Sequence, residues 1–360
     1  MAILVTGAAG YIGSHACKQL LLAGHHVVAI DNLHRGHRAA IDALHATFGD
    51  RLRFIEADVA RTPTILEELV RLDVDAVMHF AALAYVGESV DQPMAYYRAN
   101  VAAFANLLDA CATLGVQRFV FSSSCATYGQ PPDHLIPIPE TCPQSPLSPY
   151  GFTKLVGERM LTEFAAARTR AGARFAFAAL RYFNVAGCDM DGVLGEDHTP
   201  ETHLVPVVIQ AALGLRSHVE VFGDDYPTPD GTCIRDYTHV DDLARAHVAA
   251  LRALETPAAP APSARATPSA LPARELFLNL GIGKGHSVRE IIDAVARVSR
   301  REVPVKFGPR RAGDPARLFA DPRRAQDVLG WRAQITSIDE IVGSAYRWFE
   351  RHPQGYPKRS

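Results

Sequence analysis

Short apolar segments alternate with amphipathic segments along the chain up to about residue 186. The apolar segments are rich in β-branched and aromatic residues and end at turn-forming residues, which is typical of buried strands. They are AILVT (2–6), HVVAI (26–30), RFIEA (53–57), AVMHFAA (76–82), RFVFSSS (118–124) and FAFAALRYF (175–183). Because such strands are apolar on both faces and helical segments separate them, the pattern predicts a parallel sheet covered by helices on each side.

The first helical segment follows the first strand directly. Ile12, Ala16 and Leu20 recur at helical spacing, and Gly24 is placed to end the helix. We therefore predict an α/β fold with a Rossmann-type doubly wound parallel sheet, and we assign residues 1–185 to this domain.

The pattern changes after residue 186, where a polar, turn-rich stretch begins. We expect a helix at 204–214, a strand at 219–223 and a strand at 276–281, which together predict a smaller C-terminal α/β domain over 186–360. A helix at 235–254 is expected to pack with the N-terminal domain. The Pro/Ala-rich stretch 255–275 lacks large apolar residues, so we expect a flexible loop there.

The composition is that of an ordinary soluble globular protein. The 360 residues carry a net charge of −2 and are 48% hydrophobic, which gives no reason to expect nucleic acid or a membrane surface as a partner. No apolar run approaches the roughly 18–20 residues of a spanning helix, and the N-terminus lacks a signal-peptide pattern. Six dispersed cysteines favour free thiols in a reducing compartment. We expect a cytoplasmic protein.

A glycine motif marks the junction of the first strand and first helix. TGAAGYIG (6–13) places Gly7, Gly10 and Gly13 where a backbone turn can approach a pyrophosphate at the positive end of a helix. Asp31, at the end of the second strand, can accept hydrogen bonds from ribose hydroxyls and would repel a 2′-phosphate, which favours NAD over NADP. ADV (57–59) and FAA (80–82) follow the next strands and are placed to meet the adenine and the phosphate–ribose region.

A serine run, a tyrosine and a lysine follow the fifth strand. SSS (122–124) is placed near a nicotinamide, and SPYGFTK (148–154) puts Tyr150 and Lys154 on one helical face. A nearby ammonium and a cationic nicotinamide would both lower the pKa of the phenol, which is about 10 when unperturbed. Ser124 can hydrogen-bond the substrate oxygen. This set can remove a proton from a carbinol beside NAD.

Nearly the whole chain resembles the extended short-chain dehydrogenase/reductase superfamily and, within it, the UDP-glucose (UDP-galactose) 4-epimerase family. The stretches that carry the resemblance are TGAAGYIGSH (6–15), DNL (31–33), HFAA (79–82), VGESV (86–90), FSSSCATYG (121–129), SPYGFTK (148–154), LRYFNVAG (180–187), GEDH (195–198), VFGDDYPTPDGTCIRDYTHVDDLARAH (221–247), GPRRAGD (308–314) and RHPQGYP (351–357). The resemblance implies an N-terminal NAD domain, a C-terminal domain that binds a UDP-sugar, and a homodimer.

The resemblance also implies a set of site residues. Those expected to bind tightly held NAD are Gly7, Gly10, Tyr11, Ile12, Asp31, Asn32, Asp58, Val59, Phe80, Ala81, Ala82, Asn100, Ser122, Tyr150, Lys154, Tyr182 and Phe183. Those expected to bind the UDP-sugar are Ser124, Tyr150, Asn184, His203, Leu204, Val221, Phe222, Arg235, Arg311 and Asp314. The expected catalytic residues are Ser124, Tyr150 and Lys154. Arginines suit a diphosphate because they are charge-assisted donors.

The implied reaction interconverts UDP-galactose and UDP-glucose. Tyr150, as phenolate, takes the proton of the sugar's 4-hydroxyl while the 4-hydride moves to NAD; the transient 4-keto sugar turns over and is reduced on its other face. The chain departs from the common pattern at Ala84, where many members have a lysine, and at His203, where many have asparagine. Leu318 occupies the position whose size governs acceptance of N-acetylated sugars, and leucine leaves that acceptance open.

Alternative substrates and activities remain. CATYG and ETHL occur together in a branch of the family that includes UDP-arabinose (UDP-xylose) 4-epimerases, so a pentose or a UDP-N-acetylglucosamine substrate stays open. A 4,6-dehydratase is disfavoured because Ser124 and Cys125 stand where it needs an acid pair. An ordinary dehydrogenase is disfavoured by the diphosphate-binding stretches, and a non-catalytic NAD sensor by the retained Tyr150 and Lys154. We predict no metal site, because the histidines are scattered without a recognised spacing.

Overall fold

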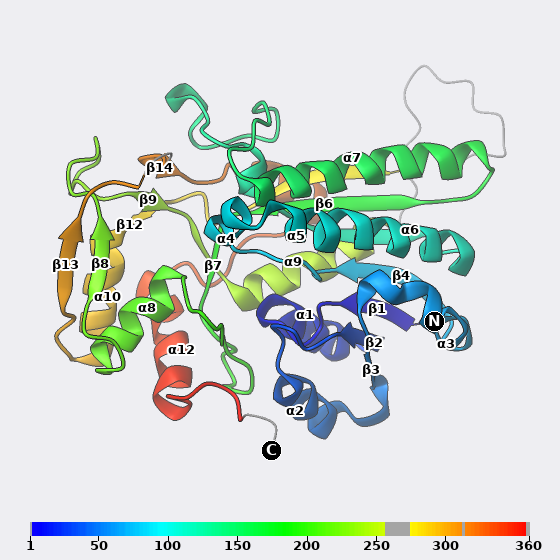
Figure 1. Cartoon of the computed structure of the whole chain (residues 1–360), viewed down its shortest axis with the longest axis horizontal. Helices are drawn as coiled ribbons and strands as arrows, with labels where there is room; N and C mark the ends of the chain where they lie inside the picture. The colour runs from blue at the N-terminus through cyan, green and yellow to red at the C-terminus, as the bar shows by residue number, and fades with distance from the viewer. Residues whose placement is uncertain (1, 256–273, 312–313, 358–360) are drawn as a thin grey trace.

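A parallel sheet forms the centre of the molecule. The computed structural model describes residues 2–255, 274–311 and 314–357 (Figure 1). Its main sheet has seven strands in the order β11-β6-β5-β4-β1-β2-β3, and all pairs are parallel. These strands are β1 (Ala2–Thr6), β2 (His26–Asp31), β3 (Leu52–Glu56), β4 (Val74–His79), β5 (Arg118–Ser124), β6 (Ala176–Tyr182) and β11 (Glu275–Leu280).

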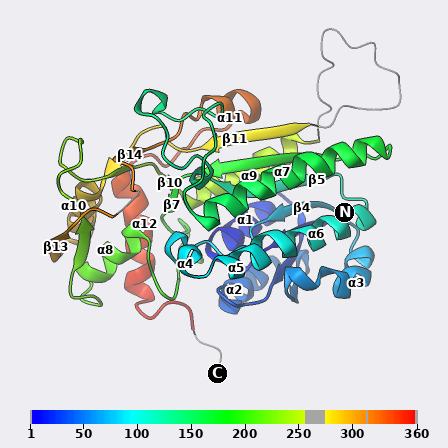
Figure 2. The ribbon, with the colours of Figure 1, turned by 45° about the horizontal axis from the view of Figure 1, so that its top comes forward.

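Helices cover both faces of this sheet, as Figures 1 and 2 show. Three helices pack their buried side chains against one face of the sheet: α1 (Tyr11–Leu22), α2 (Arg38–Phe48) and α9 (Val240–Ala253). Those on the opposite face are α3 (Leu66–Arg71), α6 (Ala103–Leu114) and α7 (Pro149–Arg170). Two short helices, α4 (Val86–Asp91) and α5 (Pro93–Tyr97), pack against α7, and a π-helical turn over Arg98–Ala102 continues into α6.

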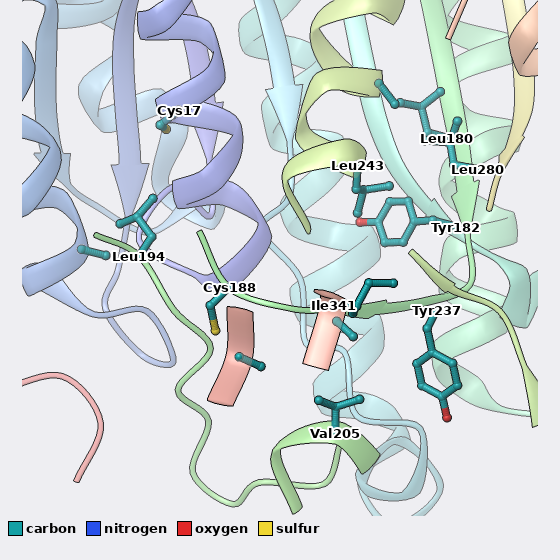
Figure 3. Packing of buried hydrophobic residues seen from close by; sticks show 14 of the residues in the cluster. Cys17, Leu180, Tyr182, Cys188, Leu194, Val205, Tyr237, Leu243, Leu280 and Ile341 are labelled. Atoms are coloured by element: carbon teal, nitrogen blue, oxygen red, sulfur yellow. The ribbon is translucent and has the colours of Figure 1, made fainter. Parts of the chain in front are cut away.

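Strand alternation divides the core into two layers. In β1, Ile3 and Val5 pack into the cluster that contains α1 and α9, whereas Leu4 packs into the cluster that contains α6 and α7. This is the period of two expected of a strand buried on both faces. Figure 3 shows part of the first cluster, which includes Leu243 of α9 and Leu180 of β6. The doubly wound α/β fold predicted from the sequence is confirmed.

Smaller sheets and four helices make up much of the second half of the chain. β7 (Asn184–Ala186) pairs with β10 (Tyr237–His239), and β8 (Val219–Phe222) pairs with β13 (Val305–Gly308). A third small sheet has the order β12-β9-β14 and consists of β9 (Ile234–Arg235), β12 (His286–Ser287) and β14 (Arg317–Leu318). The helices are α8 (Leu204–Ala212), α10 (Val288–Ser299), α11 (Arg323–Leu329) and α12 (Ile338–Arg351). Among the described helices, none is long and apolar enough to cross a membrane.

The structure differs from expectation at the start of one helix and in the position of one strand. The helix expected at 235–254 begins at Val240, because residues 234–235 and 237–239 form β9 and β10 instead; as expected, the helix packs with the N-terminal elements, against α1. The strand expected at 276–281 is β11, which lies beside β6 at the edge of the main sheet although it follows residue 185. The expected loop at 255–275 lies mostly outside the described residues.

Candidate active site

A cavity of about 820 Å³ lies at the carboxyl ends of the main-sheet strands. This is where doubly wound folds bind ligands, and the volume suits a cofactor with part of a substrate. Most residues that the sequence assigned to NAD or substrate line it. They are Gly7, Gly10, Tyr11, Ile12, Asp31, Asn32, Asp58, Val59, Phe80, Ala81, Ala82, Ser122, Ser124, Tyr150, Lys154, Tyr182, Phe183, Asn184 and His203.

The turn between β1 and α1 has room only for glycine at two positions. Gly7 has φ +70°, and a Cβ there would lie 2.5 Å from the backbone nitrogen of Ala81. A Cβ on Gly13 would lie 2.0 Å from the carbonyl oxygen of Gly7. The backbone is therefore closely packed in this turn. The first residues of α1 line the cavity, and the N–H groups at the start of a helix are suited to bind an anion there.

Two carboxylates lie at the ends of neighbouring strands: Asp31 is the last residue of β2, and Asp58 follows β3. The Asp31 side chain is buried and accepts hydrogen bonds from the backbone N–H groups of Ala9, at 3.0 Å, and Leu33, at 2.8 Å. Burial nevertheless raises its pKa. Asn32 donates to Asp58 at 2.9 Å, which joins the two strand ends. These contacts hold the oxygen acceptors at the cavity wall.

Helix α7 places Tyr150 and Lys154 in the cavity. Ser148 caps its N-terminus by accepting a hydrogen bond from the N–H of Gly151 at 3.1 Å, and Pro149 occupies the first turn. The ammonium of Lys154 donates to the backbone carbonyl of Ser122 at 2.7 Å, and its nitrogen lies 5.8 Å from the centre of the Tyr150 ring. The predicted i, i+4 pair thus shares one face of a capped helix.

The protonation of this pair differs from the expectation. Burial raises the pKa of Tyr150 to about 12, and hydrogen bonding with Ser124 only partly opposes the increase. Burial lowers the pKa of Lys154 to about 7. The residues that line the cavity therefore do not by themselves lower the pKa of the phenol, because desolvation of the phenolate outweighs the hydrogen bond with Ser124.

Three other predicted residues, Ser122, Tyr182 and Asn100, form hydrogen bonds within the protein. The hydroxyl groups of Ser122 and Tyr182 are hydrogen-bonded to each other between β5 and β6. Asn100 does not line the cavity; its amide bonds the backbone N–H and carbonyl of Leu83 and donates to Thr153 at 3.0 Å. Asn100 thus fixes the loop after β4 against α7.

The remaining predicted substrate residues lie outside the cavity lining. They are Leu204, Val221, Phe222, Arg235, Arg311 and Asp314. Arg235 in β9 forms an ion pair with Asp314, and the guanidinium of Arg311 stacks over the ring of Phe222 at 3.8 Å. Of these residues, Arg235 is next to the cavity in the small sheet, where it pairs with Leu318, a residue of the cavity lining.

Arg35, Tyr85, Glu196 and His198 are among the cavity residues that were not assigned from the sequence. The guanidinium of Arg35 stacks 4.2 Å over the ring of Tyr85 and bonds Glu88, and both Arg35 and Tyr85 line the cavity. Glu196 and His198 line it from the irregular segment before α8. Glu196 and His198 lie in GEDH (195–198), one of the stretches that carry the family resemblance, and could have been found from it. Hydrophobic periodicity could not reveal them, because they lie in an irregular loop.

Glu196 and His198 form a charged cluster with Glu201 and His203. Neighbouring carboxylates raise the pKa of His198 to about 9 and that of His203 to about 10, despite burial. The two histidines in turn lower the pKa of Glu201 to about 2. The predicted substrate residue His203 is therefore cationic at neutral pH.

The fold and the cavity define a dinucleotide-dependent enzyme of the doubly wound class. Comparison with known proteins matches residues 3–261 to the NAD dependent epimerase/dehydratase family. The chain belongs to this family.

Its relatives are similar over their full lengths. The chain is 43% identical to the UDP-glucose 4-epimerase of Lacticaseibacillus casei, with all of both chains covered. Among solved structures, it is 45% identical to the UDP-glucose 4-epimerase from Brucella ovis in complex with NAD, with TM-score 0.85 and 96% and 98% of the two chains covered. It is 40% identical to the enzyme from Stenotrophomonas maltophila with bound NAD and formylated UDP-arabinopyranose, with TM-score 0.89 and 98% and 99% covered.

The cavity fits the cofactor of this family. The Gly7 turn leaves the start of α1 open to a pyrophosphate, and the Asp31 carboxylate faces the same cavity from the end of β2. Burial of that carboxylate without a cationic side chain as hydrogen-bond partner suits ribose hydroxyls better than a 2′-phosphate. The site residues thus agree with NAD.

Proposed function

We propose that this chain is an NAD-dependent UDP-glucose 4-epimerase that interconverts UDP-galactose and UDP-glucose. The observation that carries the proposal is that Ser124, Tyr150 and Lys154 line the same cavity as the Gly7 turn and Asp31. The full-length likeness to UDP-glucose 4-epimerases supports it.

Each catalytic residue has a role that follows from its position. Tyr150 removes the proton from the sugar's 4-hydroxyl and returns it after the intermediate has turned over. Ser124 hydrogen-bonds the same oxygen and guides the proton to the phenol. Lys154, held by the carbonyl of Ser122, places a positive charge beside the Tyr150 ring. NAD, when bound, supplies reversible oxidation of the carbon that carries the hydroxyl, and its cationic ring adds the charge that the phenolate needs.

The nucleotide part of the substrate is proposed to extend toward the small sheets. Arg235 and Arg311 are donors suited to a diphosphate, and the stacking of Arg311 on Phe222 orients its planar guanidinium. His203 adds a further cationic donor at the cavity wall. Asn184, Leu204, Val221 and Asp314 are the other proposed substrate contacts. The sugar itself lies in the cavity, where Leu318 contributes an apolar side chain.

Pentose and N-acetylated substrates are the alternatives within the same chemistry. A similar structure was solved with formylated UDP-arabinopyranose, and Leu318 lines the cavity in this chain. The test is kcat/KM for UDP-galactose, UDP-arabinose and UDP-N-acetylgalactosamine under identical conditions. The proposal requires UDP-galactose to have the highest value; a higher value for either of the others would replace the assigned sugar.

We further propose that the protein is a cytoplasmic homodimer with an NAD domain at 1–185 and a UDP-sugar domain at 186–360. Support for a reducing compartment is that the six cysteines are free and buried. Support for a dimer is an exposed apolar surface on neighbouring helices α4, α5 and α7. Its residues are Val86, Val90, Met94 and Phe152, with exposures of 51%, 61%, 56% and 45%.

A further inference from the structure

Four metal-ligating side chains meet in the segment that precedes α8. Glu196, His198, Glu201 and His203 each offer one ligand atom, and these atoms all lie within 4.8 Å of one another. The sequence predicted no metal site, because these residues fall in a loop and match no familiar spacing. The fold nevertheless brings two imidazoles and two carboxylates to one point.

Three of the distances between ligand atoms are close to those around a tetrahedral ion. Oε1 of Glu196 lies 3.3 Å from Nδ1 of His198 and 3.0 Å from Nδ1 of His203. Nδ1 of His198 lies 3.6 Å from Oε2 of Glu201. Zinc bonds to nitrogen and oxygen of about 2.0–2.1 Å imply ligand-to-ligand edges of about 3.3 Å in a tetrahedron.

Several of these atoms are buried without a hydrogen-bond partner. They are Oε1 of Glu196, Nδ1 of His198 and Oε2 of Glu201, and the whole of Glu196 is only 1% exposed. The close neighbours of these atoms are the other members of the cluster, at the ion-pair distances given above. Buried polar atoms are normally satisfied, and an ion at the centre of the cluster would contact all of them. The residues also face the cavity, because Glu196, His198 and His203 line it, which gives an ion a route of entry.

The protein already orients one of the carboxylates. Oε1 of Glu201 accepts hydrogen bonds from the backbone N–H groups of Thr202 and His203, each at 2.8 Å. Oε1 also lies 2.9 Å from Nδ1 of His203, and Oε2 lies 3.6 Å from Nδ1 of His198, so the carboxylate is held between the two imidazoles. Such support by groups behind the ligands is characteristic of protein metal sites.

We propose that Glu196, His198, Glu201 and His203 bind one divalent transition-metal ion of the zinc type. Two imidazoles with two carboxylates favour Zn²⁺ or Co²⁺ over Mg²⁺, which prefers oxygen ligands and water. With all four positions filled by the protein, the ion has no open position for catalysis. Its predicted effect, which rests on the proposed function, is reversible inhibition, because His203 is then withdrawn from the UDP-sugar.

Metal binding itself is the primary test and does not depend on activity. Protein treated with a chelator and then dialysed is titrated with Co²⁺ at pH 8, and visible absorption is recorded. We expect the intense bands of tetrahedral Co²⁺, saturating at one ion per chain and lost on addition of Zn²⁺. Mg²⁺ should not displace the Co²⁺. Absence of saturable bands in the wild-type protein would overturn the proposal without reference to any variant.

Variants locate the ion. His198→Gln and Glu201→Gln each remove one ligand and should weaken Zn²⁺ binding in calorimetry by at least about tenfold. His45→Gln, at an exposed position of α2, is the matched control and should bind as wild type does. Circular dichroism and thermal unfolding confirm that each variant is folded. Wild-type affinity in both ligand variants would place the ion elsewhere and refute the proposed site. Failure of epimerase activity with intact metal binding would refute only the proposed function.

Discussion

The side chain of Lys154 bonds the backbone carbonyl of Ser122 at 2.7 Å, and this contact ties the start of α7 to the end of β5. The two elements carry the proposed base, Tyr150, and its hydrogen-bonding partner, Ser124. The position of the ammonium is therefore set by the main sheet. Its nitrogen lies 5.8 Å from the centre of the Tyr150 ring.

Replacement of Lys154 by Met should impair catalysis through the phenol. A positive charge near the ring favours phenolate, so its loss raises the pKa of Tyr150. We expect a lower kcat and an acid limb of the kcat–pH profile that moves toward higher pH. Lys306→Met, at an exposed position of β13, is the control and should leave the profile in place. An unchanged acid limb in Lys154→Met would remove the electrostatic role assigned to this residue.

Replacement of Tyr150 by Phe should remove the proton-transfer group and little else. General acid–base groups contribute about 10²–10⁴-fold to rate, so we expect kcat to fall by a factor in this range. Binding of UDP, measured by calorimetry, should stay within about twofold of wild type. Tyr97→Phe, outside the cavity lining, should keep wild-type turnover. Near-normal turnover in Tyr150→Phe would show that another group is the base.

Buried histidines should make the protein sensitive to acid. Burial lowers the pKa of His79 to about 3 and that of His247 to about 4, below the unperturbed value of about 6.5. Between pH 6.5 and 4 the unfolded chain therefore binds protons that the folded chain does not. The free energy of unfolding should fall with decreasing pH, by up to about 1.4 kcal/mol per pH unit for each histidine.

Urea unfolding at pH 7, 6 and 5 measures this dependence. His247→Leu should flatten the slope, because it removes a group that binds a proton in the unfolded chain but not in the folded chain. His45→Gln, which alters an exposed histidine, should keep the wild-type slope. If His247→Leu and wild type showed the same slope, His247 would not be neutral in the folded protein.

Most of the main sheet could be predicted because its strands can be recognised from short stretches of the sequence. Most of the strands from β1 to β6 are short apolar segments that end at turns, so length and composition suffice to find them; β3, which exposes Arg53 and Glu56, is the exception. The place of β11 could not be predicted, because its pairing with β6 joins segments almost a hundred residues apart in sequence. The two- and three-residue strands, such as β9 and β10, are too short to show any alternation.

The candidate site likewise contains residues that could be predicted from the sequence and residues that could not. Gly7, Asp31 and Tyr150 stand at fixed offsets from strands or on a helix face, so their meeting follows from the fold. Arg35 and Glu196 lie in irregular segments, and only tertiary packing brings them to the cavity. The rise in the pKa of Tyr150 was also missed, since it comes from burial, which spacing along the sequence does not measure.

The exposed apolar surface on α4, α5 and α7 should mediate the proposed dimer. Val90→Glu places a charge at its most exposed residue, and desolvation of that charge should oppose association. We expect light scattering to show a dimer for wild type and a shift to monomer for Val90→Glu. Leu22→Glu, at a position 59% exposed on α1, is the matched control and should remain dimeric. A monomeric wild-type protein would end the dimer proposal.

The most direct test of the proposed activity is a proton NMR time course of the purified protein with UDP-galactose. No cofactor is added at first, and NAD is added later to the same sample. We predict growth of the UDP-glucose anomeric signal to a stable mixture, at once if NAD is retained through purification and after the addition if it is not. A UDP-galactose spectrum that stays unchanged with NAD present would contradict the assignment of this chain as a UDP-glucose 4-epimerase.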